Sequence, residues 1–277
     1  MIAAAWAALA SSALLLLGDL VNRRVRGWMP DDPPRPGRKL HARPIPLAGV
    51  LLAPAIAPWL VAERDVPALV ALTVATAVGF LDDHGKERGH DLDWRWKALG
   101  LAVAAAAAAT AIVSPARDPV PWCVLFLFAF VLTNATNFLD NTDGVATGLG
   151  AAMLLSANGG VHGTSGIAAA GFAAVGFLPW NWPRPRLFLG DAGAYALGVL
   201  AAIAIGRLVV VDVRALWLAA LPLVDFTQVV AARLWLGLPP WVGDRRHLTH
   251  VVQNLGLQRW LCAPLFTAAA VGLALLA

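Results

Sequence analysis

The chain has 277 residues, of which 59% are hydrophobic and only 14% are charged, and its formal net charge at pH 7 is +4. Soluble globular domains carry about 25% charged residues, so this composition excludes an ordinary soluble domain and indicates a membrane protein with several spans. The small positive balance does not indicate nucleic-acid binding, because basic residues beside membrane spans are expected from topology alone. We therefore expect one integral-membrane domain over residues 1–277 and no nucleic-acid partner.

Apolar segments of nearly membrane-spanning length recur along the chain. A spanning helix needs about 20 apolar residues, with a range of about 17–25. We predict an all-α transmembrane bundle of about ten spans, several of them short and rich in Ala and Gly, which lets helices pack closely. The predicted spans are 2–20, 45–62, 66–82, 97–113, 119–136, 143–158, 164–182, 192–211, 214–235 and 260–277.

Basic residues are distributed unequally between the two sides of this predicted bundle. If the N-terminus lies outside, the loops 21–44, 83–96, 137–142, 183–191 and 236–259 lie inside. These loops and their flanking residues hold 17 of the 21 Lys and Arg residues. The positive-inside rule therefore places the N-terminus outside. The first basic cluster follows the first span instead of preceding it, which is typical of an uncleaved span.

Carboxylates and histidines gather on the same inner side. They are Asp82, Asp83, Asp140, Asp143, Asp191, Asp244, His41, His84, His90, His247 and His250. A transporter, which is the non-enzyme alternative, would place polar groups near the middle of the bilayer. Only Asp225 and Arg207 are candidates for that depth. The distribution favours an enzyme with a cytoplasmic-side cleft, acting on one water-soluble and one membrane-bound substrate.

Two acidic pairs follow apolar segments. Asp82 and Asp83 are adjacent, so in a helix their side chains point about 100° apart and can serve different partners, although an acidic pair can also simply mark the water boundary. In NATNFLDNTDG, Asp140 and Asp143 are three apart and share a face on a helical turn. The asparagines of this segment add neutral oxygens and amide donors, and Gly144 permits a tight turn.

A further carboxylate begins the eighth predicted span. In RLFLGDAGAYALG, Asp191 stands between small residues, where an aspartate can also be a helix N-cap. Five carboxylates on one side would repel one another unless a cation bound between them. Oxygen ligands favour Mg²⁺ or Mn²⁺, and Mg²⁺ usually takes one or two carboxylates with phosphate and water. With Lys97 and the basic loops, this set is typical of phosphoryl transfer.

The motifs resemble those of the polyprenyl-phosphate N-acetylhexosamine-1-phosphate transferases (glycosyltransferase family 4). Five segments carry the resemblance, in order: KLHARPIPLAGV, GFLDD with downstream Lys97, NATNFLDNTDGVATG, FLGDAGAYALG and PLVDFTQVVAARLWLGLPPWVGDRRHLTH. The resemblance implies Mg²⁺-dependent transfer of a sugar-1-phosphate from a UDP-N-acetyl sugar to polyprenyl phosphate, with release of UMP. It also implies a multi-pass protein of the bacterial inner membrane, undecaprenyl phosphate as the acceptor, and a family that is often homodimeric.

The resemblance implies a role for each matching carboxylate. Asp191 matches a direct Mg²⁺ ligand. Asp82 and Asp83 match a pair that engages the metal site and that positions or deprotonates the lipid phosphate. Asp83 is a second candidate for a metal ligand. Asp140 and Asp143 match residues near the metal and the uridine. Whether an aspartate of the pair forms a covalent phospho-intermediate or the lipid phosphate attacks directly stays open.

The resemblance also implies substrate contacts. Lys97 matches a phosphate-binding lysine, Asn137 a nucleotide-contacting asparagine, and Phe188 a ring beside the uracil. His247 and His250 match the outer members of a histidine box near the donor diphosphate and sugar. We expect further substrate contacts from Lys39, His41, Asn134, Arg245 and Arg246.

Three positions depart from the family pattern. Thr249 replaces the middle histidine of the box, Val251 replaces an arginine after it, and Ala194 replaces a serine. A different sugar and a catalytically impaired paralogue therefore stay open as alternatives. A CDP-alcohol phosphotransferase is disfavoured, because its D-G-x-x-A-R spacing is absent after Asp143 and Gly144.

Overall fold

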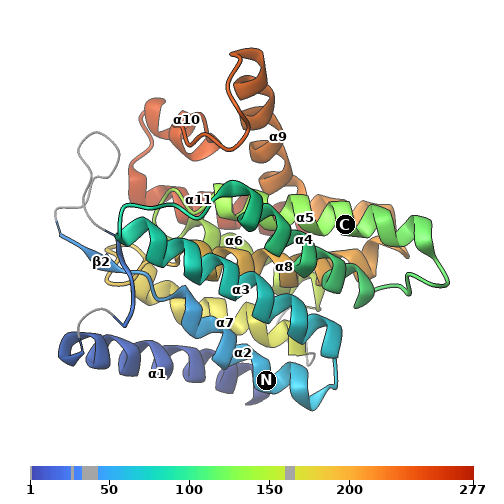
Figure 1. The fold of residues 1–277 in the computed structure, drawn as a ribbon, viewed down its shortest axis with the longest axis horizontal. Coiled ribbons are helices and arrows are strands. Elements are labelled where there is room, and N and C mark those ends of the chain that lie inside the picture. Colours follow the sequence, from blue (N-terminus) through green and yellow to red (C-terminus); the bar gives the residue numbers. More distant parts are fainter. Residues whose placement is uncertain (1, 26–27, 33–42, 160–165) are drawn as a thin grey trace.

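The computed structural model describes residues 2–25, 28–32, 43–159 and 166–277. α-Helices dominate these residues and most of them run along one direction as a bundle (Figure 1). The helices are α1 (Ile2–Arg24), α2 (Leu52–Ala62), α3 (Val66–Glu87), α4 (Trp94–Thr110), α5 (Pro119–Phe138), α6 (Val145–Ala157), α7 (Gly166–Asn181), α8 (Gly190–Val209), α9 (Ala220–Trp235), α10 (Leu248–Asn254) and α11 (Cys262–Ala274). The architecture is that of an all-α membrane protein.

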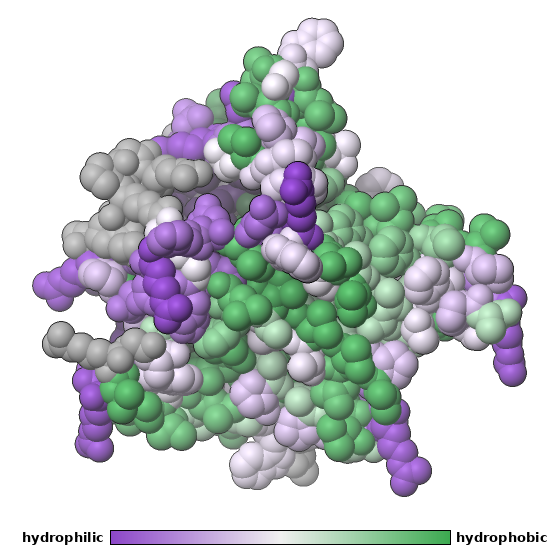
Figure 2. Space-filling model, viewed as in Figure 1, coloured by the Kyte–Doolittle hydropathy of each residue, from purple (hydrophilic) through white to green (hydrophobic). Residues whose placement is uncertain are grey.

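The apolar character of the helices agrees with this class. Within the described part of the chain, four helical segments are long and apolar enough to cross a membrane: Val66–Glu87, Pro119–Phe138, Gly190–Val209 and Val213–Trp235. Each of the ten segments predicted as a span overlaps an α-helix of the structure. Apolar side chains cover the middle of the face in Figure 2, and polar ones gather toward its two ends.

The bundle is built around α8. In this helix, 83% of the most apolar stretch is buried inside the protein, so α8 is a central helix surrounded by others. Its neighbour α3 approaches so closely that a Cβ added at Gly79 would lie 2.4 Å from the backbone nitrogen of Ala192. Small residues therefore bring the end of α3 against the beginning of α8, as packing between membrane helices favours.

A short β-ribbon was not expected from the sequence. Strand β1 (Asp31–Asp32) pairs antiparallel with β2 (Ile45–Pro46), so the predicted span 45–62 is α-helical only from residue 52. The Ala48 nitrogen donates to the Phe188 oxygen, and the Phe188 nitrogen donates to the Pro46 oxygen, both at 2.9 Å. The ribbon thereby fastens residues 45–48 to the segment that leads into α8.

Helix α9 projects away from the bundle, across the direction of its neighbours, and α10 lies beside it (Figure 1). The 3-10 helix η3 (Val213–Ala219) precedes α9, so the predicted span 214–235 is divided. At the far end of α9, Arg233 is buried, donates to Asp244 at 3.1 Å and lies over the Phe138 ring. These contacts hold the loop after α9 against the end of α5.

Candidate active site

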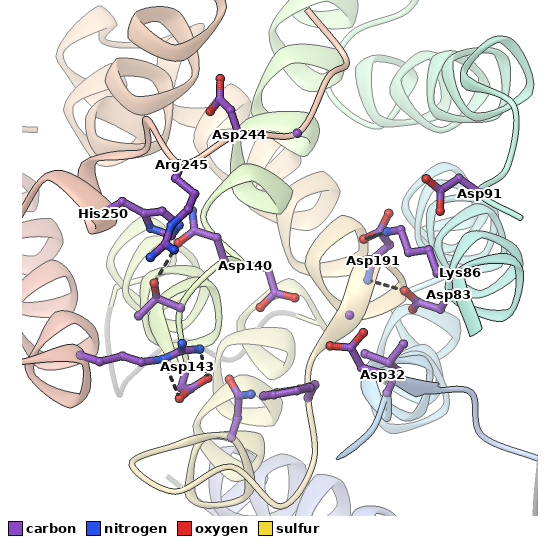
Figure 3. Close-up of a pocket in the computed structure, with 18 residues that line it drawn as sticks. Asp32, Asp83, Lys86, Asp91, Asp140, Asp143, Asp191, Asp244, Arg245 and His250 are labelled. Atoms are coloured by element: carbon purple, nitrogen blue, oxygen red, sulfur yellow. Dashed lines mark hydrogen bonds and ion pairs between the residues drawn. The ribbon is translucent and has the colours of Figure 1, made fainter. Parts of the chain in front are cut away.

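A cavity of about 550 Å³ lies at the end of the bundle where α3 and α5 end and α8 begins. Figure 3 shows Asp83, Lys86 and Asp191 on one side, Asp143, Arg245 and His250 on the other, and Asp140 between them. Seven residues singled out from the sequence line it: Asp83, Asp140, Asp143, Phe188, Asp191, Arg245 and His250. The structure thus brings these seven residues together from segments that are far apart along the chain.

Asp82 lies behind the cavity lining and is fully buried. Its Oδ2 atom is 2.6 Å from Lys86 Nζ and 2.7 Å from Lys97 Nζ, and its Oδ1 atom accepts from the Leu92 nitrogen at 3.0 Å. A buried carboxylate needs such partners to remain charged. Asp82 therefore fixes the two lysines and the loop before α4.

Asp83 holds the beginning of α8. Its Oδ1 atom accepts from the Asp191 nitrogen at 3.0 Å and its Oδ2 atom accepts from the Ala192 nitrogen at 3.1 Å. Gly190 has a φ of +66°, and a Cβ at this position would lie 2.7 Å from Asp83 Oδ2. Only glycine suits both the backbone and the close approach. The adjacent aspartates do serve different partners, as their helical spacing predicts.

Asp191 is the centre of a charged network. Lys86 Nζ lies 2.7 Å from its Oδ1 atom, Lys97 Nζ lies 3.4 Å from its Oδ2 atom, and Asn137 donates to Oδ1 at 3.1 Å. Lys86 was missed as a site residue, although it stands four residues after Asp82 on α3, a spacing that brings side chains together. We call Asp82, Asp83, Lys86, Lys97 and Asp191 the lysine–aspartate cluster.

Asp140 differs from the other carboxylates of the cavity. Among the residues that the structure describes, no hydrogen bond or ion pair engages its carboxylate, which lies between the two sides in Figure 3. Burial raises the pKa of Asp140 well above its usual range, and the charges of Asp191 and Asp83 raise it further. Gly144, with a φ of +75°, closes the turn behind it, as expected. Asp140 is thus a carboxylate placed to take up a cation or a proton.

Asp143 is paired with a residue that the sequence did not single out. Arg259 Nη2 lies 2.8 Å from Asp143 Oδ1, and Arg259 Nε lies 3.1 Å from Asp143 Oδ2. Both residues line the cavity. Asn181, also missed, lines it too and accepts from the Gly144 nitrogen at 3.0 Å. No sequence pattern marks Arg259, because it reaches the cavity from a turn after α10.

The histidine box divides between the cavity and the protein interior. His250 lines the cavity, whereas His247 is buried with its Nδ1 atom 2.8 Å from Asp225 Oδ2. Asp225 also accepts from the Leu248 nitrogen at 2.6 Å, so this mid-helix carboxylate orients the box. Thr249 is fully buried and donates to Asn141 Oδ1 at 2.5 Å.

The positions that depart from the family pattern do not line the cavity. Val251 is 42% exposed and lies outside the lining, and Ala194 is buried in α8. Thr249 is buried and lies outside the lining as well.

His250 and Arg245 lie on the same side of the cavity as Asp143 and Arg259. Burial, with smaller contributions from the neighbouring His247, Arg245 and Arg259 side chains, lowers the pKa of His250 to about 4. Neutral imidazole at pH 7 can donate and accept hydrogen bonds. We call Asp143, Arg245, His250 and Arg259 the arginine–histidine cluster.

The loop before His250 is held by Asp244. Burial opposes ionisation of this carboxyl group, but hydrogen bonds from Arg233 and Arg246 outweigh it and lower the pKa of Asp244 to about 2. Arg246 Nη1 lies 2.7 Å from Asp244 Oδ2, so Arg246 is engaged within the loop and does not line the cavity.

Three further predicted site residues are Asn134, Lys39 and His41. Asn134 donates to the Phe130 oxygen at 2.8 Å, within its own helix, and does not line the cavity. Lys39 and His41 lie outside the described residues. Their predicted roles in substrate binding stay predictions.

The carboxylates of the cavity suit a hard divalent cation. Among the described residues, no three His, Cys, Asp or Glu side chains form a group that could hold a metal ion by themselves. Mg²⁺ requires fewer protein ligands, because it usually binds one or two carboxylates together with phosphate oxygens and water. Asp140 and Asp191, which both line the cavity, fit that requirement.

Comparisons with known proteins show which proteins the chain is similar to. The family model described as glycosyl transferase family 4 matches residues 66–208, more than half of the chain. An undecaprenyl-phosphate alpha-N-acetylglucosaminyl 1-phosphate transferase of Escherichia coli (strain K12) is 31% identical over 168 residues, which cover 54% of this chain and 46% of that relative. This chain therefore spans about half the length of that relative.

Two other relatives match over longer stretches. A protein of the same name from Thermotoga maritima is 28% identical over 230 residues, covering 80% of this chain and 72% of the relative. A decaprenyl-phosphate N-acetylglucosaminephosphotransferase of Mycobacterium leprae is 25% identical over 309 aligned positions, covering 87% and 73%. The similarity thus extends beyond the matched family region in both directions.

Proposed function

Because the chain belongs to glycosyl transferase family 4, we propose that it transfers a sugar-1-phosphate from a UDP-sugar to a polyprenyl phosphate and releases UMP. The expected unit is an N-acetylhexosamine-1-phosphate and the expected acceptor is undecaprenyl phosphate, in keeping with the names of the relatives. This reaction would be the first membrane step in the assembly of a cell-envelope glycan.

One observation carries the proposal. The cavity of about 550 Å³ has ammonium and carboxylate groups on one side and guanidinium and imidazole groups on the other, at the end of an apolar bundle. Such a cavity can accept a doubly phosphorylated, water-soluble donor, while the adjoining apolar surface suits a lipid acceptor. A solute transporter fits less well, because Arg207 pairs with Asp65 and Asp225 is paired with His247.

The proposed setting is the bacterial inner membrane. We propose about ten spans, with the N-terminus outside and the cavity facing the cytoplasm. The distribution of Lys and Arg supports this orientation, since 17 of the 21 fall on the side of the cavity under the predicted topology. A homodimer is a further proposal that rests on the resemblance alone.

The chemistry follows from the residues present. An oxygen of the lipid phosphate would attack the β-phosphorus that bears the sugar, the bond to the bridging oxygen would break, and UMP would leave with that oxygen. A phosphate monoester is largely ionised at pH 7, its second pKa being about 6, so positioning matters more than a strong base. Lys86 and Arg245 line the cavity and would orient the phosphates.

Asp140 and Asp191 would hold Mg²⁺, or Mn²⁺ in its place. When bound, the ion would neutralise the negative charge that develops on the diphosphate. Asp191 would exchange part of its present pairing with Lys86 and Lys97 for that ligand. The lysines would then face phosphate oxygens, which are their natural alternative partners.

Release of UMP tests the proposal. The purified protein in detergent would receive undecaprenyl phosphate, Mg²⁺ and a panel of UDP-N-acetyl sugars. We expect lipid-dependent UMP release with at least one donor, its loss in Asp191→Asn, and its retention in Asp212→Asn. Asp212 is the matched control because its ion pair among the described residues is local, with Arg214 at 2.7 Å, on an exposed turn. Absence of release from folded wild-type protein with every donor would refute the proposal.

A further inference from the structure

Arg259 occupies a turn that is built into the cavity wall. It begins the 3-10 helix η4 (Arg259–Leu261), directly after the loop that follows α10. The indole nitrogen of Trp182 donates to the Trp260 oxygen at 2.7 Å, which ties the turn to the end of α7. A Cβ at Gly144 would lie 2.7 Å from Trp182 Cβ, so the Asp143 turn packs against the same tryptophan. Arg259 and Asp143 are therefore positioned by one common support.

The guanidinium of Arg259 is oriented by Asp143 and keeps further N–H donors for a ligand. It meets Asp143 through Nε at 3.1 Å and Nη2 at 2.8 Å, a side-on pair in which both carboxylate oxygens take part. A guanidinium has five N–H donors in a planar fork, and this pair requires two of them. The Arg259 side chain is 35% exposed and lines the cavity, so its other edge is accessible to a ligand there.

Arg259 lies on the same side of the cavity as His250. The histidine box was expected to contact the donor diphosphate and sugar from this side. Position 251, where the family pattern has an arginine, carries an exposed valine outside the cavity lining. His247 is buried against Asp225 and Thr249 is buried against Asn141. Arg245 and Arg259 are thus the fixed positive charges that this side offers among the described lining residues.

We propose that Arg259 is a donor-binding residue that contacts the diphosphate of the UDP-sugar, with Asp143 holding its guanidinium in place. The assignment rests on the proposed function. A planar guanidinium recognises phosphate oxygens through two parallel hydrogen bonds. A carboxylate on its other edge already restricts its rotamers, so less side-chain entropy is lost when a ligand binds. Asp143 then acts as a positioning residue for Arg259 in addition to lining the cavity.

Binding measurements separate a phosphate contact from a structural role. Uridine, UMP, UDP and the active UDP-sugar would compete against a labelled UDP-sugar, in detergent with Mg²⁺, for wild type, Arg259→Ala and Arg259→Lys. We expect Arg259→Ala to weaken UDP and UDP-sugar about tenfold to hundredfold, the usual range for one charge-assisted contact, and to leave uridine unchanged. Arg259→Lys should fall between, because it retains the charge without the fork.

Arg214→Ala is the matched control, because Arg214 makes the same kind of pair with Asp212 on an exposed turn. It should bind every ligand like wild type. Equal weakening of uridine and UDP in Arg259→Ala would show an effect on the fold and overturn the assignment, as would unchanged UDP affinity. If the wild-type protein binds no uridine nucleotide, this result refutes the proposed function, and with it the role of Arg259 in binding the donor.

Discussion

The two sides of the cavity are built in different ways. The lysine–aspartate cluster stands on α3, α4 and α8, and every one of its carboxylates has two or more partners within about 3 Å. In the arginine–histidine cluster, Asp143 stands on the turn between α5 and α6, and the other three residues stand on a loop, the seven-residue helix α10 and a turn, after a helix that projects from the bundle. The first cluster is rigid because packed helices define it, and the second depends on a few hydrogen bonds. We infer that chemistry belongs to the first and recognition of the donor to the second.

Asp140 lies between the two clusters and gives the largest expected effect. Asp140→Asn should lower the rate of UMP release by about 10²–10⁴-fold, the range for loss of a group that takes part in the reaction. The same change should leave the thermal stability unchanged or raise it. The carboxylate has no described partner, and burial beside Asp191 and Asp83 raises its pKa, so its charge destabilises the fold.

The combination of lost activity and retained stability is the informative result. It is measured by the initial rate and by thermal unfolding of the same preparations. Asp212→Asn should change neither quantity. A parallel loss of activity and stability would show that Asp140 supports the fold, and would remove it from the reaction.

Asp83 tests whether the lysine–aspartate cluster owes its order to helix capping. Asp83→Ala should lower the free energy of unfolding by about 1–3 kcal/mol, because it leaves the buried N–H groups of Asp191 and Ala192 without an acceptor. Activity should fall about tenfold to hundredfold as α8 loses its position. Asp83→Asn, which keeps one acceptor, should lose less stability and less activity than Asp83→Ala.

Titration with Mg²⁺ decides between the two roles of Asp83. If it caps α8, the Mg²⁺ concentration for half-maximal activity should stay within about twofold of wild type in Asp83→Asn, since the proposed ligands are Asp140 and Asp191. The resemblance implied that Asp83 is itself a ligand. An increase of tenfold or more with unchanged stability would restore that role.

The sequence predicted the lysine–aspartate cluster better than the arginine–histidine cluster for a physical reason. Carboxylates at the ends of apolar helices must meet at one end of a bundle, so Asp83 and Asp191 could be placed together from periodicity and topology. Arg259 could not, because a turn between short helices has no period. Of the histidine box, His250 lines the cavity, but the spacing of the box did not show that His247 and Thr249 face inward.

Thr249 tests how far the arginine–histidine cluster depends on single hydrogen bonds. Its hydroxyl donates to Asn141 Oδ1, which also accepts from Thr142 Oγ1 at 2.9 Å. Thr249→Val removes the donor at nearly constant volume and should cost about 0.5–1.5 kcal/mol of stability, with a loss of activity of about threefold to tenfold. Thr249→Ser should restore both. Equal activity in all three proteins would show that Asn141 needs no support from α10.

His250 gives the smallest effect, through the pH dependence of stability. Its pKa is about 4 in the folded protein, against about 6.5 in an unfolded chain, so between these values the unfolded state binds more protons. Its contribution to stability is fully present above pH 6.5 and is lost as the pH falls toward 4. Thermal unfolding at pH 7.0 and pH 5.0 should therefore show a larger decrease for wild type than for His250→Gln, which cannot titrate.

The difference between the two proteins should be about 1 kcal/mol, because the side chain is only partly buried and solvent screens its charged neighbours. Arg259→Gln should reduce it, since Arg259 is one of the positive charges that disfavour protonation of His250. If wild type and His250→Gln lose stability equally between pH 7.0 and pH 5.0, His250 titrates normally. The arginine–histidine cluster would then be more open to solvent around His250 than the structure shows.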